Sequence, residues 1–573
     1  MEVERRSVGE VAPELAARYP RFFADALAAR GIDSADALDL SLSGLLSPRS
    51  LRGVDVAAER LARAVTGGEP VLVVGDFDAD GATGTALAVS VLRAFGAESV
   101  DFLVPNRFDF GYGLSPELAR VALAREPAVV MTVDNGIASV EGVRVLQAAG
   151  VDVVVTDHHL AGAELPPAYA IVNPNAPGCR FPSKALAGVG VVYYVLSQVR
   201  AQLEAAGHFN AAAPPRPNLA AWLDLVALGT VADVVPLDRN NRILVHHGLR
   251  RIRAGRARPG IAALAEAAKR STRRMRAADL GFAIGPRLNA AGRLDDMSAG
   301  IECLLADDLR AARPLAARLD TLNLERRDIE QAMTAEAAVL IDEAGADGES
   351  AVCVYEPGWH QGVIGIVAGR VRERLHRPTI AFADAGEMAP DELRGSARSI
   401  PNLHIRDAIA DVAARFPGLV VRFGGHAMAA GLTIKRVQLA RFSKAFREAV
   451  DARVSARDLR DVRATDGDLP GTELTLENAL LVADHGPWGA GFEEPTFHGE
   501  FEVVHERVVG ERHLKLVLKR GERVADAIAF DQEPLGARRV RALYQLGIND
   551  YRDMETLQLR VADIEPVPTA SAE

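Results

Sequence analysis

The stretch VLVVGDFDADG, residues 71–81, decides the fold of the segment around it. It opens with an unbroken apolar run, VLVVG, which is typical of a strand buried on both faces of a parallel sheet. Asp76, Asp78 and Asp80 follow this run directly. Binding sites in open α/β sheets form outside the carboxyl ends of the strands, so these acids indicate a site at that edge.

The same pattern repeats downstream. Further apolar runs occupy 100–104, 128–133 and 151–156. The segments between and after them have helical character, and the predicted helices are 85–95, about 115–125, about 139–149, 185–203 and 219–229. Short apolar strands that alternate with helices predict an α/β domain whose parallel sheet is covered on both faces.

Polar side chains also follow the later elements of this domain. Asp134 comes after the run 128–133, His158 and His159 come after 151–156, and Asp233 comes after the last helix. We expect these side chains to converge in one cleft. Carboxylates are ligands for hard divalent cations, and imidazole adds affinity for Mn²⁺, Zn²⁺ or Fe²⁺. Two cations about 3.5–4 Å apart in such a cluster would form a clamp for phosphoryl displacement.

Each motif alone has a simpler interpretation. DFDADG opens like a calcium-binding EF-hand loop, but its twelfth position is Leu87 instead of Glu, and a strand precedes it. A lone acidic turn could be solvated, and a lone Asp-His-His could begin a helix. Four polar clusters in register favour a shared site. The sequence has no GxxxxGK[ST] segment, which disfavours a P-loop ATPase.

Composition sets weaker limits. The net charge of −11 argues weakly against a polyanion-binding protein and leaves an acidic metabolic enzyme open, although a local basic groove can coexist with an acidic surface. Cys179, Cys303 and Cys353 form neither zinc spacing nor a disulfide framework. The N-terminus lacks the apolar core of a signal peptide, and the longest apolar stretch, 186–199, is too short for a bilayer. We therefore expect a cytoplasmic protein.

The chain is long enough for several domains. Helical spacing over 314–344 predicts a long connecting helix, and strands at 351–356 and 378–383 begin a second α/β domain. Five predicted strands from about residue 498 fit a small OB-like barrel. The predicted segments are a helical lead-in (1–60), the first α/β domain (61–250), a helical region (251–345), the second α/β domain (346–458), the barrel (459–566) and a tail (567–573).

Several motifs identify a family. GDFDADG (75–81), VDNG (133–136), DHH (157–159) and VADVVPL (231–237) resemble the signature motifs of the DHH phosphoesterase superfamily. Four further segments are similar to those of its single-strand-specific DNA exonucleases: GPRLNAAGRLDD (285–296), WHQGVIGIVAGRV (359–371), RGSARS (394–399) and GGHAMAAG (424–431). The resemblance runs from about residue 50 to the C-terminus.

The resemblance implies a metal centre. The implied ligands are Asp78, Asp80, Asp134, His158 and Asp233. Asp134 would bridge two ions, and His159 would face the scissile phosphate as a hydrogen-bond donor or acid, so these two are the expected catalytic residues. Some members carry a histidine where this chain has Val74, which leaves one ion with fewer protein ligands unless Asp76 or water fills the position. We expect Asp76 and Asp157 to support the site from behind.

Other segments are expected to contact the substrate. The candidates for phosphate contact are Asn106, Arg107, Arg287, Asn289, Arg293, Arg394, Ser396, Arg398, Gly424, Gly425 and His426, most of them in predicted glycine-flanked loops. Aromatic residues of the loop 105–114 either stack on bases or pack against the loop itself: Phe108, Phe110 and Tyr112. On the barrel, Lys515, Lys519 and Arg520 with Phe501 and Tyr544 either follow a strand or are simply solvated.

The resemblance implies a 5′→3′ exonuclease specific for single-stranded DNA, acting in DNA repair and recombination with two Mn²⁺ or Mg²⁺ ions. The implied partners of this expected monomer are single-stranded DNA, a single-strand-binding protein and a RecQ-type helicase. Two alternatives stay open. One is a DHH-type oligoribonuclease, pAp phosphatase or pyrophosphatase, which would have little need for the barrel. The other is a non-catalytic nucleic-acid-binding relative, which the intact acidic set disfavours.

Overall fold

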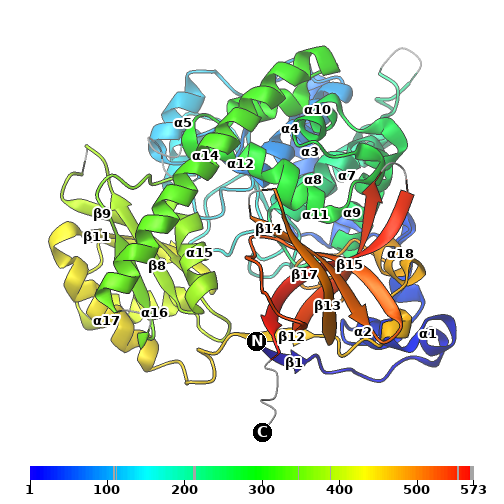
Figure 1. The fold of residues 1–573 in the computed structure, drawn as a ribbon. Coiled ribbons are helices and arrows are strands. Elements are labelled where there is room, and N and C mark those ends of the chain that lie inside the picture. Colours follow the sequence, from blue (N-terminus) through cyan, green and yellow to red (C-terminus); the bar gives the residue numbers. More distant parts are fainter. Residues whose placement is uncertain are drawn as a thin grey trace, which may run out of the picture. The chain divides into compact units, whose positions relative to one another are not determined.

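The computed structural model describes residues 1–106, 110, 113–210, 214–345, 348–387, 389–510, 512–551 and 554–567. The chain forms two compact units (Figure 1). The first unit comprises Met1–Asp320 and Arg463–Glu573, and the second comprises Thr321–Val462. Within the described residues, no helix is long and apolar enough to cross a membrane.

A five-stranded parallel sheet lies at the centre of the first unit, as predicted. Its strands are β2 (Val71–Val74), β3 (Val100–Leu103), β4 (Val129–Val133), β5 (Asp152–Thr156) and β6 (Ala170–Val172), in the order β3-β2-β4-β5-β6. The sequence analysis did not identify β6. The chain adds β3 on one side of β2 and then crosses to add β4 on the other. This reversal opens a crevice at the carboxyl ends of β2 and β4.

Helices cover both faces of this sheet, which explains its apolar strands. On one face, α5 (Pro116–Leu123) and α6 (Val140–Ala148) share a hydrophobic cluster with Val74 and Val130. On the other face, α4 (Ala79–Ala94) and α7 (Gly188–Ala205) approach Val133. There a Cβ on Gly84 of α4 would lie 2.6 Å from Val133 Cγ1 and 3.4 Å from Val189 Cα of α7.

Helix α4 begins at Ala79, six residues before the predicted start at 85. Asp78 causes the earlier start, because its carboxylate caps the helix by accepting hydrogen bonds from the backbone N–H groups of Asp80 and Gly81, both at 3.0 Å. A Cβ on Gly81 would lie 2.7 Å from the backbone nitrogen of Asp76, so only glycine fits there. The acidic motif is therefore the first turn of α4 and not a loop ahead of it.

Further helices complete the first unit. These are α1 (Pro13–Arg18), α2 (Arg21–Ala28), α3 (Val54–Gly67), α8 (Leu223–Ala232), α9 (Arg239–Arg251), α10 (Pro259–Ala267), α11 (Ala277–Asp279), α12 (Gly285–Leu294), α13 (Ser298–Leu305) and α18 (Leu476–Asp484). The lead-in also contains strand β1 (Glu2–Arg5), which pairs with β12 (Val462–Thr465). The long predicted helix is α14 (Leu309–Ala344), and it continues from the first unit into the second.

The second unit has its own sheet, with strand order β10-β11-β9-β8-β7. The strands are β7 (Val352–Tyr355), β8 (Thr379–Asp384), β9 (Glu392–Arg398), β10 (Arg422–Gly425) and β11 (Ala429–Lys435), and the helices are α15 (Ile364–Leu375), α16 (Ile405–Arg415) and α17 (Leu439–Asp451). The prediction that 394–399 forms a loop was wrong, because most of it lies in β9. A Cβ on Gly395 would lie 2.6 Å from the ring of Phe382, so this glycine serves strand packing and not a turn.

The C-terminal strands form a closed five-stranded barrel, as predicted: β13 (Phe497–Val509), β14 (His513–Arg520), β15 (Arg523–Ala529), β16 (Arg539–Tyr551) and β17 (Met554–Pro566). They are drawn from orange to red in Figure 1. Phe501 and Tyr544 are buried in its interior, which excludes them as an exposed stacking surface. Lys515 pairs with Asp526 at 3.1 Å, and Arg520 pairs with Asp468, so the proposed basic track is partly neutralised.

Candidate metal centre

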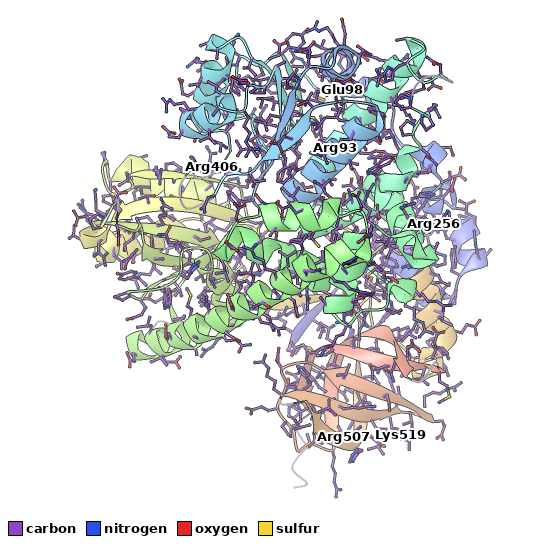
Figure 2. The ribbon with its side chains drawn as sticks, turned by 90° about the horizontal axis from the view of Figure 1, so that it is seen from above. Arg93, Glu98, Arg256, Arg406, Arg507 and Lys519 are labelled. Carbon is purple, nitrogen blue, oxygen red and sulfur yellow. The ribbon has the colours of Figure 1, made fainter. Side chains whose placement is uncertain are left out.

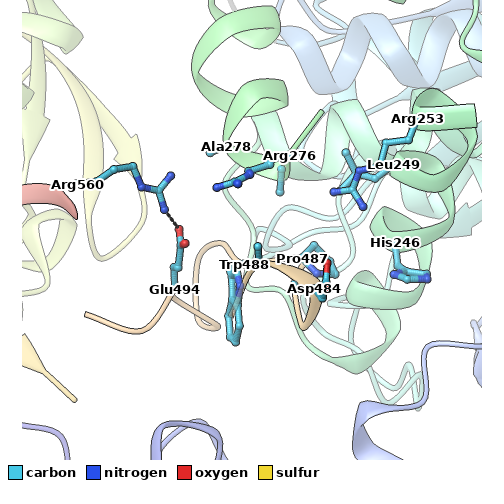
Figure 3. A pocket seen from close by; sticks show the side chains of 13 residues that line it. His246, Leu249, Arg253, Arg276, Ala278, Asp484, Pro487, Trp488, Glu494 and Arg560 are labelled. Carbon is cyan, nitrogen blue, oxygen red and sulfur yellow. Dashed lines mark hydrogen bonds and ion pairs between the residues drawn. The ribbon is translucent and has the colours of Figure 1, made fainter. Parts of the chain in front are cut away.

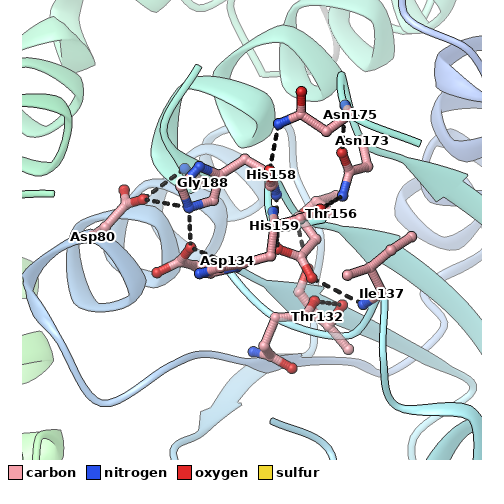
Figure 4. A network of polar contacts seen from close by, with 12 residues as sticks. Asp80, Thr132, Asp134, Ile137, Thr156, His158, His159, Asn173, Asn175 and Gly188 are labelled. Atoms are coloured by element: carbon pink, nitrogen blue, oxygen red, sulfur yellow. Dashed lines mark hydrogen bonds and ion pairs between the residues drawn. The ribbon is translucent and has the colours of Figure 1, made fainter. Parts of the chain in front are cut away.

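Three elements bring four of the predicted ligands together, and Figure 4 shows Asp80, Asp134 and His158 among them. Asp78 and Asp80 start α4, Asp134 follows β4, and His158 follows β5. The Nε2 atom of His158 lies 3.0 Å from Oδ1 of Asp134 and 4.0 Å from Oδ2 of Asp80. The convergence of strand-end residues is therefore as predicted.

Asp233 reaches the same place from a helix. It caps the C-terminal end of α8, and its Oδ2 lies 3.6 Å from Nε2 of His158. Close packing of α8 on α4 makes this possible, because Gly229 of α8 has no side chain: a Cβ there would lie 2.2 Å from Thr83 Oγ1 and 3.0 Å from Asp80 Oδ1. Asp233 thus joins the site by helix packing, which the strand-end argument does not cover.

The ligand atoms form three groups that could each hold an ion. Asp80, His158 and Asp233 form one group, and Asp76, Asp78 and Asp134 form another, with the ligand atoms of each group within 4.8 Å of one another. A third group, Asp134, His158 and His159, shares one residue with each of the first two and so links them. The expectation that Asp76 only supports the site from behind does not fit this geometry. Val74 packs into the hydrophobic cluster beneath α5 and α6, and Asp76 offers an oxygen to the group that lacks a histidine.

The buried polar atoms fit a cation. Within the described part of the chain, Nε2 of His158 and Oδ2 of Asp233 are buried and form no hydrogen bond, despite their short separation. Burial, followed by the charges of Asp233 and Asp78, raises the pKa of Asp80 well above its ordinary value. Burial and Asp78 raise the pKa of Asp233 to about 7. Carboxylates that repel each other and an imidazole nitrogen together suit Mn²⁺ or Mg²⁺.

Backbone donors hold Asp80 in place. Its two carboxylate oxygens accept hydrogen bonds from the N–H groups of Gly188 at 2.6 Å and Val189 at 2.9 Å, at the start of α7. The positive end of the helix dipole favours a negative charge here. Gly188 is also pressed against Asp134, since a Cβ on it would lie 2.6 Å from Asp134 Cβ. The sequence analysis did not single out Gly188, although it begins the small-residue sequence GVG at a helix start.

The backbone around Asp134 is unusual. Asp134 has a φ of +62°, and Gly136 has a φ of +114°. Between them, Asn135 donates from its Nδ2 to the carbonyl oxygens of Val133 at 2.9 Å and of Val74 at 3.1 Å. The Asn135 amide therefore links the ends of β2 and β4 at the crevice. The left-handed backbone at Asp134 directs its carboxylate into the site, on the side away from this link.

Asp157 orients both histidines from behind. Its Oδ1 accepts hydrogen bonds from the backbone N–H groups of His158 and His159 and lies 2.8 Å from Nδ1 of His159. Burial opposes the charge on His159, but the hydrogen bond and charge of Asp157 outweigh it and raise the pKa of His159 to about 9. Burial and the charge of His159 lower the pKa of His158 to about 4. At neutral pH these pKa values leave His158 neutral, as a metal-binding imidazole has to be, and His159 charged.

The predicted phosphate contacts of 285–296 lie on a helix, α12, and not in a loop. Asn289 accepts a hydrogen bond from the N–H of Ala79 at 2.7 Å, and Arg287 pairs with Asp320 at 2.8 Å. A Cβ on Gly292 would lie 1.7 Å from the carbonyl oxygen of Phe77. Asn289 therefore supports the acidic turn directly, and Arg293 lies one turn further along α12.

In the second unit, the predicted contacts lie on neighbouring strands. Arg394, Ser396 and Arg398 alternate along β9 and share one face, where Arg398 Nη1 donates to Ser396 Oγ at 3.2 Å. On β11, Gly431 is paired with Ser396 and Ala429 with Arg398. Gly424 and Gly425 end the next strand, β10, and His426 follows them in the turn. The structure thus gathers these residues on one part of a single sheet.

The loop 105–114 is described only in part. Arg107, Phe108 and Tyr112 lie outside the described residues. The carbonyl oxygen of Asn106 accepts a hydrogen bond from the N–H of Phe110 at 3.0 Å. Phe110 packs against the hydrophobic cluster under α5 and α6, so for this residue the packing interpretation holds.

This fold and site define a DHH-type phosphoesterase. Residues 70–230 match the DHH family N-terminal domain, residues 348–452 match the DHHA1 domain, and residues 465–563 match the RecJ OB domain. Two single-stranded-DNA-specific exonucleases RecJ, from Salmonella typhimurium and Escherichia coli, are each 48% identical over 99% of this chain and 99% of their own. The chain belongs to the RecJ family.

Solved structures agree with this assignment. The crystal structure of RecJ in complex with Mn²⁺ from Thermus thermophilus is 29% identical, has a TM-score of 0.80, and covers 99% of this chain and 79% of its own. The structure of exonuclease RecJ bound to manganese is 33% identical with a TM-score of 0.59, and it covers 72% of this chain and 100% of its own.

Proposed function

We propose that this protein is a metal-dependent exodeoxyribonuclease that degrades single-stranded DNA from its 5′ end. The RecJ relatives that match its full length carry the single-strand-specific exonuclease name, and RecJ structures contain Mn²⁺ or Mg²⁺. The observation that carries the proposal is the set of three ligand groups linked through Asp134 and His158, whose buried atoms suit two cations.

Each residue has a defined part in this proposal. Asp80, His158 and Asp233 would hold one cation, and Asp76 and Asp78 would hold the other, with Asp134 close enough to both groups to serve either. Divalent cations bound there would supply activation of water and neutralise charge on the scissile phosphate. His159, charged because of Asp157, keeps an N–H at Nε2 that donates to a phosphate oxygen as negative charge develops there.

The second unit would bind the strand backbone. Ser396 and Arg398 on β9, together with Gly424, Gly425 and His426 at the end of β10, offer a guanidinium, a hydroxyl and backbone N–H groups, which suit phosphate oxygens. In the first unit, Asn106, Arg107 and Arg293 remain candidates for substrate contact. We assign Asn289 to support of the acidic turn and Arg287 to the attachment of α12 to α14, because their side chains bond to Ala79 and Asp320 within the protein.

The test uses oligonucleotides labelled at either end, with Mn²⁺ or Mg²⁺ and the full-length protein. A 5′ label should appear at once as mononucleotide, whereas a 3′ label should remain on progressively shorter strands. Asp134→Ala should abolish activity. Asp101→Ala is the matched control, because Asp101 is exposed on β3 of the same sheet and pairs with Arg125. Early release of the 3′ label, or full activity of Asp134→Ala, would exclude this function.

An enzyme for short nucleotides, such as an oligoribonuclease or pAp phosphatase, would share the metal centre. The closed barrel and the match to RecJ relatives over 99% of the chain disfavour it. Faster turnover of dinucleotides or pAp than of long strands would favour that alternative. As further parts of the proposal, the protein is a cytoplasmic monomer that acts in repair and recombination with a single-strand-binding protein and a RecQ-type helicase, and pull-down with each purified partner tests the last point.

A further inference from the structure

One segment of the first unit reverses the acidic character of the chain. Between Arg239 and Arg276 the sequence contains twelve lysines and arginines and a single acid, Glu266, although the whole chain has a net charge of −11. This segment begins with α9 and continues through a π-helical turn, Ile252–Arg256. None of its residues belongs to the metal-ligand groups.

The end of α9 and the turn after it line a basic hollow of about 510 Å³. Its charged lining consists of His247, Arg250, Arg251, Arg253 and Arg256, and among the described residues no acidic side chain lines it. Arg251 lies 3.7 Å from the buried carboxylate of Asp224, which anchors it. Arg250, Arg253 and Arg256 are exposed, and Figure 2 labels Arg256 on this surface.

Two further hollows adjoin this one. One, of about 480 Å³, shares His247 and Arg250 with it. The other is a narrow pocket of about 90 Å³, shown in Figure 3, which shares Arg253 and adds Arg276 and Arg560. Arg560 comes from β17 of the barrel, where Glu494 binds its guanidinium. The three hollows share lining residues and together follow α9 and its C-terminal turn, ending beside the barrel, so we treat them as one groove. Its arginines outnumber the acids that also line it, which are Asp39, Asp484 and Glu494.

The positive charges in the groove affect each other. Burial, followed by the charges of His247, Arg250 and Arg253, lowers the pKa of His246 to about 4. Burial and Arg250 also act together to lower the pKa of His247. A bound anion would relieve the repulsion between these positive charges. The groove should therefore bind anions more tightly than isolated arginines would.

We propose that this groove, defined by His247, Arg250, Arg253, Arg256, Arg276 and Arg560, is a second strand-binding site that holds the phosphate backbone of single-stranded DNA outside the metal centre. The identity of the polyanion rests on the proposed function. The extended shape favours a strand over a small anion, because three linked hollows with cations along their length match a chain of phosphates. Contacts to phosphate carry no sequence information, and stacking of a base on Trp488 of the narrow pocket would be sequence-tolerant, so we expect binding without sequence preference.

The experiment compares a triple variant, Arg250→Gln, Arg253→Gln and Arg256→Gln, with wild type. The matched control removes three exposed arginines elsewhere in the first unit: Arg49→Gln, Arg120→Gln and Arg310→Gln. Binding is measured by fluorescence anisotropy at several salt concentrations, with phosphorothioate strands of about 30 and about 5 nucleotides. Cleavage of the corresponding ordinary strands is measured with the same proteins and Mn²⁺.

The slope of log affinity against log salt for the long strand should fall by about 2, because each phosphate contact with a single strand contributes about 0.7. The control should keep the wild-type slope, and all three proteins should cleave the short strand at equal rates. The single variant Arg256→Gln, which perturbs the fold least, should lower the slope by about 0.7.

An unchanged slope in the triple variant would overturn the inference. A triple variant that binds an acidic peptide or duplex DNA more weakly, but binds the single strand with wild-type affinity, would also overturn it. Failure of the wild type to cleave the long single strand would instead contradict the proposed function. The binding slopes need no cleavage, so the two failures can be told apart.

Discussion

Gly188→Ala should disable the metal centre although Gly188 is not a ligand. The backbone N–H of Gly188 donates to Asp80, and its missing side chain leaves room for Asp134. A methyl group at this position would lie 2.6 Å from Asp134 Cβ and 2.8 Å from Asp134 Oδ1. Gly188 has no positive φ, so the backbone itself accepts alanine, and the effect comes only from this contact.

The size of the effect follows from these distances. Ordinary contact begins near 3.4 Å, so Asp134 or the start of α7 has to move by about 0.8 Å. A misplacement of about 1 Å in a catalytic group costs about 100-fold in rate, and we expect kcat to fall by that factor. Alanine is favoured over glycine in a helix by about 1 kcal/mol, which offsets part of the strain, so Tm should change by only a few degrees.

The assays are cleavage of a 5′-labelled single strand, Mn²⁺ binding by calorimetry, and thermal unfolding. Gly190→Ala is the matched control, two residues further along the same helix. The one close contact of its added Cβ would be with the terminal Cδ2 of Leu186, at 3.0 Å, and this flexible side chain can turn away. A folded Gly188→Ala protein with wild-type kcat and Mn²⁺ affinity would refute the argument that this contact positions Asp134.

Three further predictions concern the support of the site. Asn289→Ala should lower the stability by about 1–3 kcal/mol and reduce kcat more than it raises KM, because it leaves the N–H of Ala79 without its acceptor; a pure KM effect would indicate a direct phosphate contact instead. When Mn²⁺ is added at about 100 times its Kd to protein freed of metal by a chelator, the free energy of unfolding should rise by about 2.7 kcal/mol. Calorimetry of Asp233→Asn should show that most of this increase is lost. In metal-free protein, the charged His159–Asp157 pair should stabilise fully below about pH 6.5 and lose its effect as the pH rises through about 9. The Tm difference between wild type and His159→Gln should therefore be large at pH 6 and small at pH 10, and an equal difference at both would contradict the assigned charge.

Local sequence was enough to predict the parallel sheet and the acids at its strand ends, because short unbroken apolar runs such as 128–133 are typical of strands buried on both faces of a parallel sheet. Glycine misled the interpretation of 285–296 and 394–399. Both were predicted as loops, yet Gly292 allows α12 to touch Phe77 and Gly395 makes room for the ring of Phe382. A glycine needed for close packing and one needed for a turn look the same in a single sequence.

The metal centre gathers acidic groups that repel each other, and the fold offsets this repulsion with backbone donors. The start of α4 donates to Asp78, and the start of α7 donates to Asp80. Asp157 in turn accepts three N–H groups, from Ile137, His158 and His159, and its pKa is lowered even though burial opposes this. These donors come from helix starts and strand ends that meet only in the folded chain. The predicted ligands are therefore held close together by the protein itself, and we expect cation binding to need little rearrangement of the backbone.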